Sequence, residues 1–409
     1  MFSSKMFHAN SGGGWLQRAF PGGFASTSSA GIRVTPEVAM SYDAVYACVT
    51  LLAESIAQLP CELYVRGKGN ARDKATDHPV YQLIHNQPNS INTPFEYFEY
   101  GQGCLGMYGN HYAVKTLNRR GYPESLNHFH PDFVIPLKGK DGLLYYRLLE
   151  HNEVVPANKM LHVRGFSLNG YVGISPIQAC KNTIGLGIAT QSHAAKMFDR
   201  GSTISGVIER PDKREGLDQE AVDKLLESWK QRHAGTQNAH SVALLQEGMT
   251  FKPLNMKAED AQLIQSRGFS VKDVCRIFKV PPHMIQDLEK SSFNNIEHQG
   301  LQFVMYTLMS WLKRWEQSLM RDLLLPEERT KYYIEFNVAG LLRGDTKTRY
   351  EAYAIGRQWG WLCVNDIRRL ENLPPIDGGD IYLNPLNMVE AGTTPTTQQI
   401  QEIEDILSA

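Results

Sequence analysis

Apolar residues spaced three and four apart mark one long helix in the second half of the chain. Its predicted face consists of Leu301, Val304, Leu308, Trp311, Trp315 and Leu319. Asn294 followed by Glu297 is typical of a capping box, and Pro326 predicts the end of the helix. At 1.5 Å per residue, such a helix is about 45 Å long. An apolar face of that length needs a neighbour, either another element of this chain or a second copy of it.

Helical periodicity also dominates the N-terminal part. Ser41 is expected to cap a helix that continues to Leu59 and is ended by Pro60. Thr93–Glu96 combines a capping box with proline at the first helical position, and it predicts a helix toward Leu105.

Between Asn110 and Gly165 the period falls to two, which is typical of strands. Turn residues separate five predicted strands, His111–Leu117, Glu124–His130, Phe133–Leu137, Leu143–Leu149 and Met160–Gly165. An antiparallel meander beside helices predicts an α+β fold.

Two predicted helices bracket a small α/β insert in the middle of the chain. The first begins after Ser175 and ends at Gly201, and the second is Ala258–Phe278. Helices that bracket an insert are expected to form a hairpin with the insert at its tip. The strands expected in the insert are Gly206–Glu209, Ser241–Leu245 and Thr250–Pro253.

Two glycines lie inside the first of these helices. Gly185 and Gly187 each cost about 1 kcal/mol relative to alanine in a helix interior. That cost favours a compensating close approach of another backbone. After Pro326 we expect a strand at Lys331–Val338, a helix capped by Asp345 and a last helix capped by Asn365.

Composition limits the classes of protein that fit. A chain of 409 residues with 42% hydrophobic and 21% charged residues predicts two or three packed units and excludes wholesale disorder. A net charge of -1 argues against coating nucleic acid by charge neutralisation. Six scattered cysteines without a CxxC pair fit reduced thiols, and no apolar run approaches the length of a membrane span. We therefore expect a soluble, intracellular chain with no membrane contact.

Catalytic motifs give weak signals, so no catalytic residue, cofactor or metal is expected. Gly101–Gly106 matches GxGxxG, but it sits at the end of a predicted helix and runs into a strand, whereas a dinucleotide site has the strand first and the helix after it. The thirteen histidines show no HExxH motif. A nucleotide-using enzyme stays an alternative. So does a DNA-binding regulator, because Val271–Met284 has the spacing of a helix-turn-helix, although its second half begins with two prolines.

Several segments in one order give the chain its resemblance to a family. They are Ala44–Pro60, Gly109–Ala113, Gly173–Ile177, Phe278–Met284, Ser292–Gln299 and Asn365–Glu371, followed by Gly378–Asp380. In this order the chain resembles the portal proteins of tailed phages, the head-to-tail connectors. The resemblance implies a non-enzymatic dodecameric ring at one capsid vertex of the virion, assembled in the host cytoplasm, through which double-stranded DNA passes without sequence preference.

The same resemblance implies a division of the chain. It comprises a flexible Gly/Ser-rich arm (1–35), the N-terminal part of a wing (36–174), a first stem helix (175–204), a clip (205–256), a second stem helix (257–286), a tunnel loop (287–295), a long helix with a wing strand (296–340), a helical crown (341–392) and a polar tail (393–409). The clip would engage the terminase large subunit and then head-completion adaptors, and the wing would engage the major capsid protein or scaffold.

Candidate site residues follow from this layout. The polar tunnel loop would touch the DNA backbone through Glu289, Lys290, Ser291, Ser292, Asn294 and Asn295. Basic residues of the stem would face DNA, or instead form a solvated face or ion pairs between subunits; they are Lys196, Arg200, Arg267, Lys272 and Arg276. Gly185 and Gly187 would allow tight packing between neighbouring subunits. Without the family resemblance, an ordinary surface connection would be the favoured interpretation of the loop.

Overall fold

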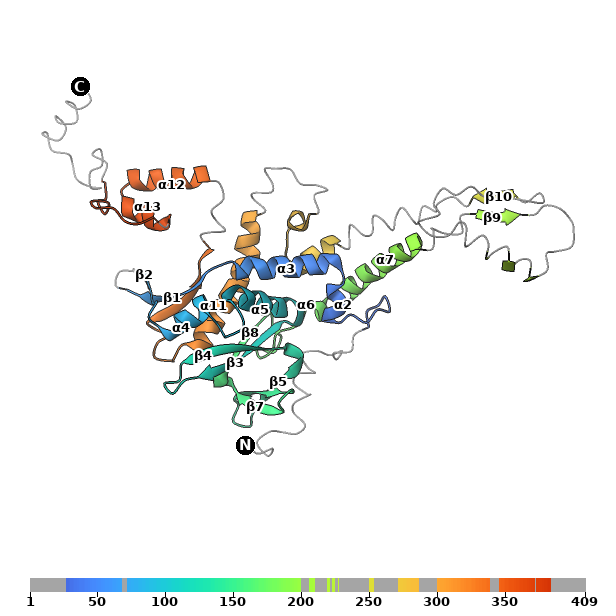
Figure 1. Ribbon diagram of the computed structural model, residues 1–409, viewed down its shortest axis with the longest axis horizontal. Coiled ribbons are helices and arrows are strands. Elements are labelled where there is room, and N and C mark those ends of the chain that lie inside the picture. Colours follow the sequence, from blue (N-terminus) through green and yellow to red (C-terminus); the bar gives the residue numbers. More distant parts are fainter. Residues whose placement is uncertain are drawn as a thin grey trace, which may run out of the picture. The chain divides into compact units, whose positions relative to one another are not determined.

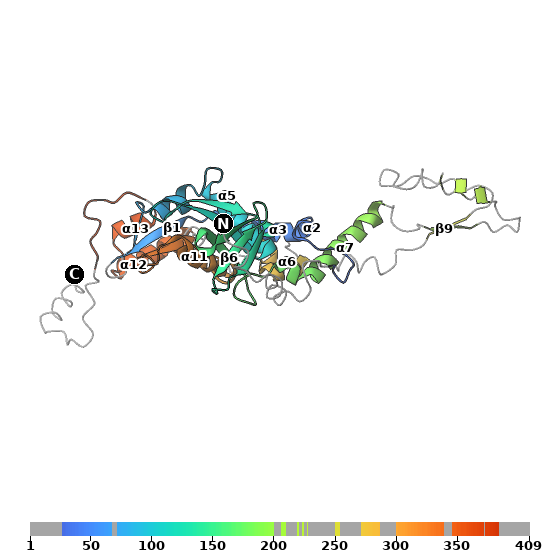
Figure 2. The same cartoon turned by 90° about the horizontal axis from the view of Figure 1, so that it is seen from below.

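The computed structural model describes most of the chain outside the arm, the insert and the tail. The described residues are 27–67, 72–199, 206–209, 219–220, 223–224, 227, 250–253, 271–286, 300–338, 346–371 and 373–383. They belong to two compact units, divided after Asn337. Helices and antiparallel sheets are mixed throughout the first unit, so the predicted α+β class is confirmed (Figures 1 and 2).

The helices before residue 110 begin and end at local signals. They are α2 (Pro36–Met40), α3 (Asp43–Ala57), α4 (Pro79–Tyr81), the π-helical η3 (Gln82–Asn86) and α5 (Pro94–Tyr108). The capping box of α5 is confirmed, because Thr93 Oγ1 accepts from Glu96 N and Glu96 Oε2 accepts from Thr93 N. The prediction that Ser41 caps α3 is wrong. Ser41 ends α2, where its hydroxyl donates to the Val38 carbonyl at 2.7 Å.

Nine of the strands described in this unit form three antiparallel sheets of three strands each. The bounds are β1 (Cys61–Arg66), β2 (Arg72–Lys74), β3 (Asn110–Leu117), β4 (Pro123–Phe129), β5 (Val134–Lys138), β6 (Leu144–Leu148), β7 (Glu153–Pro156), β8 (Met160–Arg164) and β11 (Tyr332–Phe336). The strand orders are β11-β1-β2, β4-β3-β8 and β5-β6-β7. Cys61 lies opposite Phe336, so β11 returns from far along the chain to the first strand.

The predicted single meander is therefore wrong. A 3₁₀ turn at Pro131–Phe133 takes the chain out of the first sheet, and β8 then comes back to pair with β3, with His111 opposite Val163. The two sheets share one core cluster, which comprises Tyr112, Val134, Tyr146, Leu148, Val155 and Met160. Burying these apolar side chains between two short sheets is what stabilises either of them.

The long helix is confirmed from residue 300 to Leu323, with a change of period inside it. A π-helical segment, η8 (Phe303–Leu308), precedes α11 (Met309–Leu323). The extra residue per turn moves the apolar face, so Phe303 is buried while Leu301, predicted on the buried face, is 46% exposed. Trp315 and Leu319 are fully buried, as predicted.

This helix has its neighbours within the chain. Helix α11 packs on β8 and β11 (Figure 1). The Trp315 ring lies edge-on to Phe98 of α5, with ring centroids 5.2 Å apart. Of the two neighbours that the sequence left open, the described part of α11 therefore uses the same chain.

The remaining elements of the first unit include the predicted stem and insert. The helix after Ser175 is broken at Cys180 into α6 (Pro176–Ala179) and α7 (Lys181–Asp199). Strands β9 (Gly206–Glu209) and β10 (Thr250–Pro253) pair antiparallel, as the sequence predicts for them. The second stem helix is described over 271–278 and is followed by the 3₁₀ turn η7 (Pro282–Ile285).

The second unit contains α12 (Thr346–Gln358) and α13 (Val364–Leu370). Its last helix is capped by Cys363, whose sulfur accepts from Asp366 N at 3.3 Å. The prediction that Asn365 is the cap is therefore wrong. Asn365 is buried two residues after the cap, and its amide holds the following loop by bonds to the backbone N and O of Ile376.

Candidate functional site

Two segments of the family pattern, far apart in sequence, meet at the base of α6. Asn110 Oδ1 accepts from Gly173 N at 2.7 Å, and Asn110 Nδ2 donates to the Gly173 carbonyl at 2.9 Å. Gly109 ends α5 with φ +74°, and a Cβ there would lie 2.1 Å from the Ile174 carbonyl oxygen. Both glycines are therefore required by a close crossing of backbones. This crossing fixes where the stem-like helix leaves the sheet.

Helix α7 is then docked on the N-terminal part of the chain. A Cβ on Gly185 would lie 2.4 Å from Ser28 Oγ, and one on Gly187 would lie 2.7 Å from Tyr42 Cε1. Asn182 Oδ1 accepts from Ser29 N at 3.0 Å in the same contact. The neighbours of both glycines described here are side chains of the same chain rather than another backbone. Packing between subunits at Gly185 and Gly187 stays a prediction.

The segment before the predicted tunnel loop is anchored on the body. Val274, Cys275, Phe278 and Val280 are buried. Thr307 Oγ1, in η8, donates to the Lys279 carbonyl at 2.7 Å. The described chain stops at Gln286 and resumes at residue 300 within the long helix. Residues 287–299 are thus bounded on both sides by anchored elements.

Few of the predicted DNA-facing residues lie in the described part. Arg276 is exposed and forms an ion pair with Asp273 three residues before it, whereas Lys272 is half-buried. Lys196 belongs to α7. Outside the described residues lie Arg200, Arg267, Glu289, Lys290, Ser291, Ser292, Asn294 and Asn295. The DNA contact of the whole set stays a prediction.

The helix-turn-helix alternative loses its second helix. After the helix at 271–278, Lys279 takes a left-handed conformation with φ 55°. Two prolines lead into η7, a single 3₁₀ turn that ends at Gln286 with φ 68°. A reading helix needs several regular turns to enter a major groove. Within 271–286, the structure offers none.

The glycine motif of the enzyme alternative lies inside α5, where Gly101 and Gly106 are buried. A Cβ on Gly101 would lie 2.6 Å from Cη2 of Trp315, and one on Gly106 would touch Val49 of α3. These glycines let helices and an indole pack closely. They do not face a cavity where a pyrophosphate could sit.

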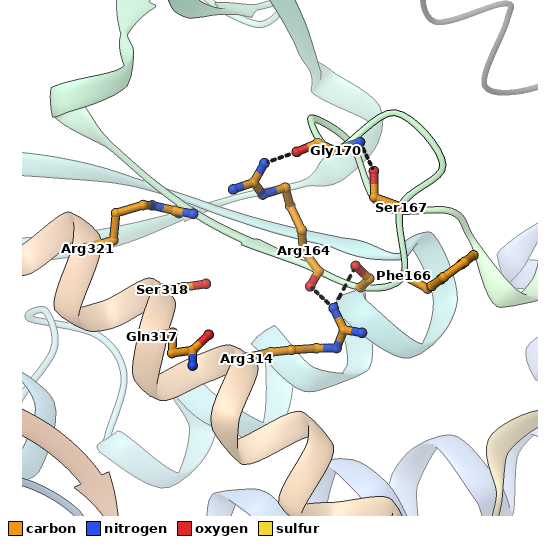
Figure 3. A pocket seen from close by; sticks show the side chains of 9 residues that line it. Arg164, Phe166, Ser167, Gly170, Arg314, Gln317, Ser318 and Arg321 are labelled. Atoms are coloured by element: carbon orange, nitrogen blue, oxygen red, sulfur yellow. Dashed lines mark hydrogen bonds between the residues drawn. The ribbon is translucent and has the colours of Figure 1, made fainter.

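A pocket rich in arginine opens between α11 and the loop after β8 (Figure 3). It has a volume of about 520 Å³ and is lined by Arg164, Gly165, Phe166, Ser167, Gly170, Arg314, Gln317, Ser318 and Arg321. Arg164 comes from β8 and donates to the Gly170 carbonyl across the loop. Arg314 donates to the Gly165 carbonyl at 3.0 Å. Backbone carbonyls thus hold two of the guanidinium groups in place.

Positive charge is in excess in this pocket. Arg321 pairs with Asp322 at 2.6 Å and also donates to the His162 carbonyl at 2.7 Å. Among the described residues, the ion pair made by these three arginines is the one between Arg321 and Asp322. Burial and the nearby Arg321 charge lower the pKa of Arg164, while Asp322 raises the pKa of Arg321. The guanidinium groups of Arg164 and Arg321 therefore repel each other, and an anion bound between them would offset this repulsion.

The sequence analysis did not predict this pocket, although the sequence contains a signal for it. Arg314 and Arg321 are seven residues apart, and Gln317 and Ser318 lie between them on the same side of the predicted helix. A polar stripe of that kind is normally a solvated face. Only the return of β8 beside α11 gives it a second wall.

Solved structures with a similar fold are proteins of particle necks and portals. One is described as the neck of a native gene transfer agent (GTA) particle computed with C12 symmetry, with TM-score 0.58, 20% identity, and coverage of 88% of this chain and 98% of that one. Another is a crystal structure of an HK97 family phage portal protein from Corynebacterium diphtheriae, with TM-score 0.55, 17% identity, and coverage of 77% and 99%. These likenesses define the fold.

Sequence relatives define the family. Residues 43–372 match the family model described as phage portal protein. The probable portal protein of Streptomyces phage phiC31 is 32% identical over 90% of this chain and 83% of its own length. The portal protein of Enterobacteria phage HK97 is 29% identical over 92% and 93%. The chain belongs to the phage portal protein family.

None of the described helices combines the length and the apolarity needed to cross a bilayer.

Proposed function

We propose that this chain is the subunit of a portal ring at one vertex of a phage capsid, serving as the channel for genome packaging and ejection without catalysing a reaction. The observation that carries the proposal is the family match over residues 43–372. The hydrogen bond between Thr307 of η8 and the Lys279 carbonyl supports it, because it joins the two described elements that flank residues 287–299. The regulator using 271–284 is not favoured, since η7 replaces its reading helix.

The ring would be a dodecamer formed by heterologous contacts between neighbouring subunits. Such contacts give a closed ring when a full turn is a whole multiple of the rotation between neighbours. The C12 symmetry of the GTA neck, a protein of the same fold, supports twelve copies. Large apolar side chains near the start of the long helix support further protein contacts, because Met305 is 59% exposed and Tyr306 is 69% exposed.

Within such a ring, residues 287–295 would line the tunnel. One lysine and several Ser and Asn side chains would contact phosphates without a strongly basic surface, so that duplex DNA could slide. The terminase large subunit and then head-completion adaptors would dock on the clip at 205–256. The major capsid protein or scaffold would contact the wing, and assembly would take place in the host cytoplasm.

Mass photometry of the purified full chain tests the ring. We expect a species of about twelve times the 46.1 kDa chain mass, together with free subunits. A monomer or dimer under every assembly condition would overturn the proposal. Sequence-specific binding of a short duplex by a dimer would instead favour the regulator.

Deleting Lys290–Asn294 tests the tunnel loop. We expect rings of normal mass but about tenfold less packaged or retained DNA, because the loop would face the channel and hold no core. Lys290→Gln should give a smaller loss of the same kind. Lys140→Gln, which removes the same charge from the exposed turn between β5 and β6, serves as the matched control. Failure of the deletion variant to form rings would contradict the assignment of this loop to the channel.

A further inference from the structure

The arginine pocket beside α11 lies in a rigid frame. The loop after β8 is closed by its own side chains: Asn169 Oδ1 accepts from Tyr171 N at 2.9 Å and Val172 N at 3.0 Å. Ile174 N donates to the Phe166 carbonyl at 2.7 Å and joins the two ends of the loop. Side chains that are already held lose little freedom on binding, so this pocket is preorganised.

The donors of the pocket exceed its acceptors. Each guanidinium carries five N–H groups. Arg164 and Arg314 use some of theirs on backbone carbonyls, and neither forms an ion pair in the described part of the chain. Arg321 and Arg164 extend from α11 and β8 toward the same space (Figure 3). A carboxylate placed there would accept charge-assisted hydrogen bonds from two guanidinium groups at once.

The rim of the pocket is apolar. Phe166 is 66% exposed and Leu168 is 65% exposed on the loop that forms one wall. Exposed aromatic and aliphatic side chains next to arginine are typical of the centre of a protein interface. A nucleic acid backbone would use the guanidinium groups but would leave these two side chains in water.

The position along the helix also favours a protein partner. The predicted tunnel loop ends before residue 300, and Arg314 lies about 20 Å further along the helix at 1.5 Å per residue. Arg321 is about two turns beyond Arg314. The pocket is therefore well away from the segment assigned to the channel.

We propose that this pocket receives an aspartate or glutamate side chain of the neighbouring copy of the chain, with Phe166 and Leu168 packing beside it. This inference rests on the ring proposed above. The acid would bind between Arg164 and Arg321, in the pocket that Arg314 also lines, and balance the excess charge. Because a ring interface is heterologous, every subunit would donate one such acid and receive another.

Assembly of variant full-length chains tests this proposal. Arg314→Glu places in the pocket a negative charge that would repel the incoming acid. It should raise the protein concentration needed for half-assembly at least tenfold. Arg164→Gln should raise it severalfold, and added NaCl should weaken wild-type assembly. Arg120→Gln, on the exposed 118–121 turn, removes one charge outside the pocket and should leave assembly unchanged.

The apolar rim is tested separately. Phe166→Ser should also raise the half-assembly concentration severalfold, whereas Leu143→Ser, at an equally exposed apolar position, should not. Thermal unfolding of the subunits guards against misfolding, since Phe166→Ser removes an exposed side chain and should leave the subunit's melting temperature within a few degrees.

A photoreactive p-benzoylphenylalanine in place of Gln317 identifies the occupant. A cross-link to a peptide of a second copy that contains Asp or Glu would support the proposal. Normal rings from both arginine variants with impaired DNA retention, or a cross-link to DNA, would overturn it in favour of phosphate binding. Failure of the wild-type chain to form rings would overturn the proposed function itself, so the two failures are distinguishable.

Discussion

The two sides of helix α11 differ in where their polar groups find partners. On the buried side, Trp315 Nε1 donates to Gln102 Oε1 at 3.0 Å, and Glu316 accepts from Phe336 N at 3.1 Å and from Lys313 Nζ at 2.6 Å. On the pocket side, Arg314 and Arg321 form a group with Arg164. In the described part of the chain, the ion pair of this group is the one between Arg321 and Asp322. The buried side is closed within the chain, and the pocket side leaves charge for a partner.

This difference separates stability from assembly. Substitutions on the buried side should lower the free energy of unfolding of the subunit. Those on the pocket side should change the subunit little and act on its association. The four predictions that follow test this division, beginning with the largest expected effect.

Trp315→Ala should have the largest effect on the subunit. The indole is fully buried, lies against Phe98 and fills the space that a Cβ on Gly101 would occupy. Removing it would leave a cavity and should lower the free energy of unfolding by about 3–5 kcal/mol. Urea unfolding of the subunit measures this loss. A loss no greater than that of Arg314→Gln would contradict the division between the two sides.

Acid should weaken the same buried side through its histidines. His111 Nε2 and His128 Nδ1 are 3.0 Å apart, and burial lowers the pKa of His128 to about 4 and that of His111 well below its usual value. Between about pH 6.5 and 4 the unfolded chain binds protons that the folded chain does not. Stability is therefore full above pH 6.5 and falls as the pH approaches 4, by on the order of 3 kcal/mol for His128 alone.

Urea unfolding at several pH values measures this slope. His128→Gln should flatten it, because the variant side chain does not titrate in this range. His193→Gln, on an exposed position of α7, is the matched control and should keep the wild-type slope. An unchanged slope in His128→Gln would show that the buried histidine pair is not the source.

Glu316→Ala should come next. The carboxylate is buried and accepts from the backbone N–H of Phe336, which would be left without this partner. An unsatisfied buried donor costs about 1–3 kcal/mol, so we expect a loss of about 2 kcal/mol in the free energy of unfolding. Glu316→Gln, which keeps an acceptor, should lose less. Equal losses in the two variants would point to charge rather than the hydrogen bond.

The smallest effect is expected on the pocket side. Arg314→Gln and Arg164→Gln should each change the free energy of unfolding of the subunit by less than about 0.5 kcal/mol, because the lost hydrogen bonds to carbonyls are offset by relief of repulsion among guanidinium groups. Chemical denaturation below the assembly concentration measures this. A loss above about 2 kcal/mol would mean that the arginines hold the fold rather than a partner.

Local signals in the sequence predicted much of the fold. The capping box at Thr93 and the burial of Trp315 and Leu319 were correct. So were strands β9 and β10 at their predicted bounds. Each of these depends on residues a few positions apart, whose spacing matches the period of a helix or a strand. The order of the family segments likewise identified the portal fold.

Tertiary structure alone decided the division into sheets and the candidate pocket. The return of β8 to β3, the π-helical turn at Phe303–Leu308 and the crossing of Asn110 with Gly173 join residues that are distant in sequence or that shift the local period. Likewise Arg164 and Arg314 lie 150 residues apart in the sequence, so no short window contains both, and only the fold brings them together. Spacing determines which face of an element is apolar, but which surface covers that face depends on how the whole chain packs.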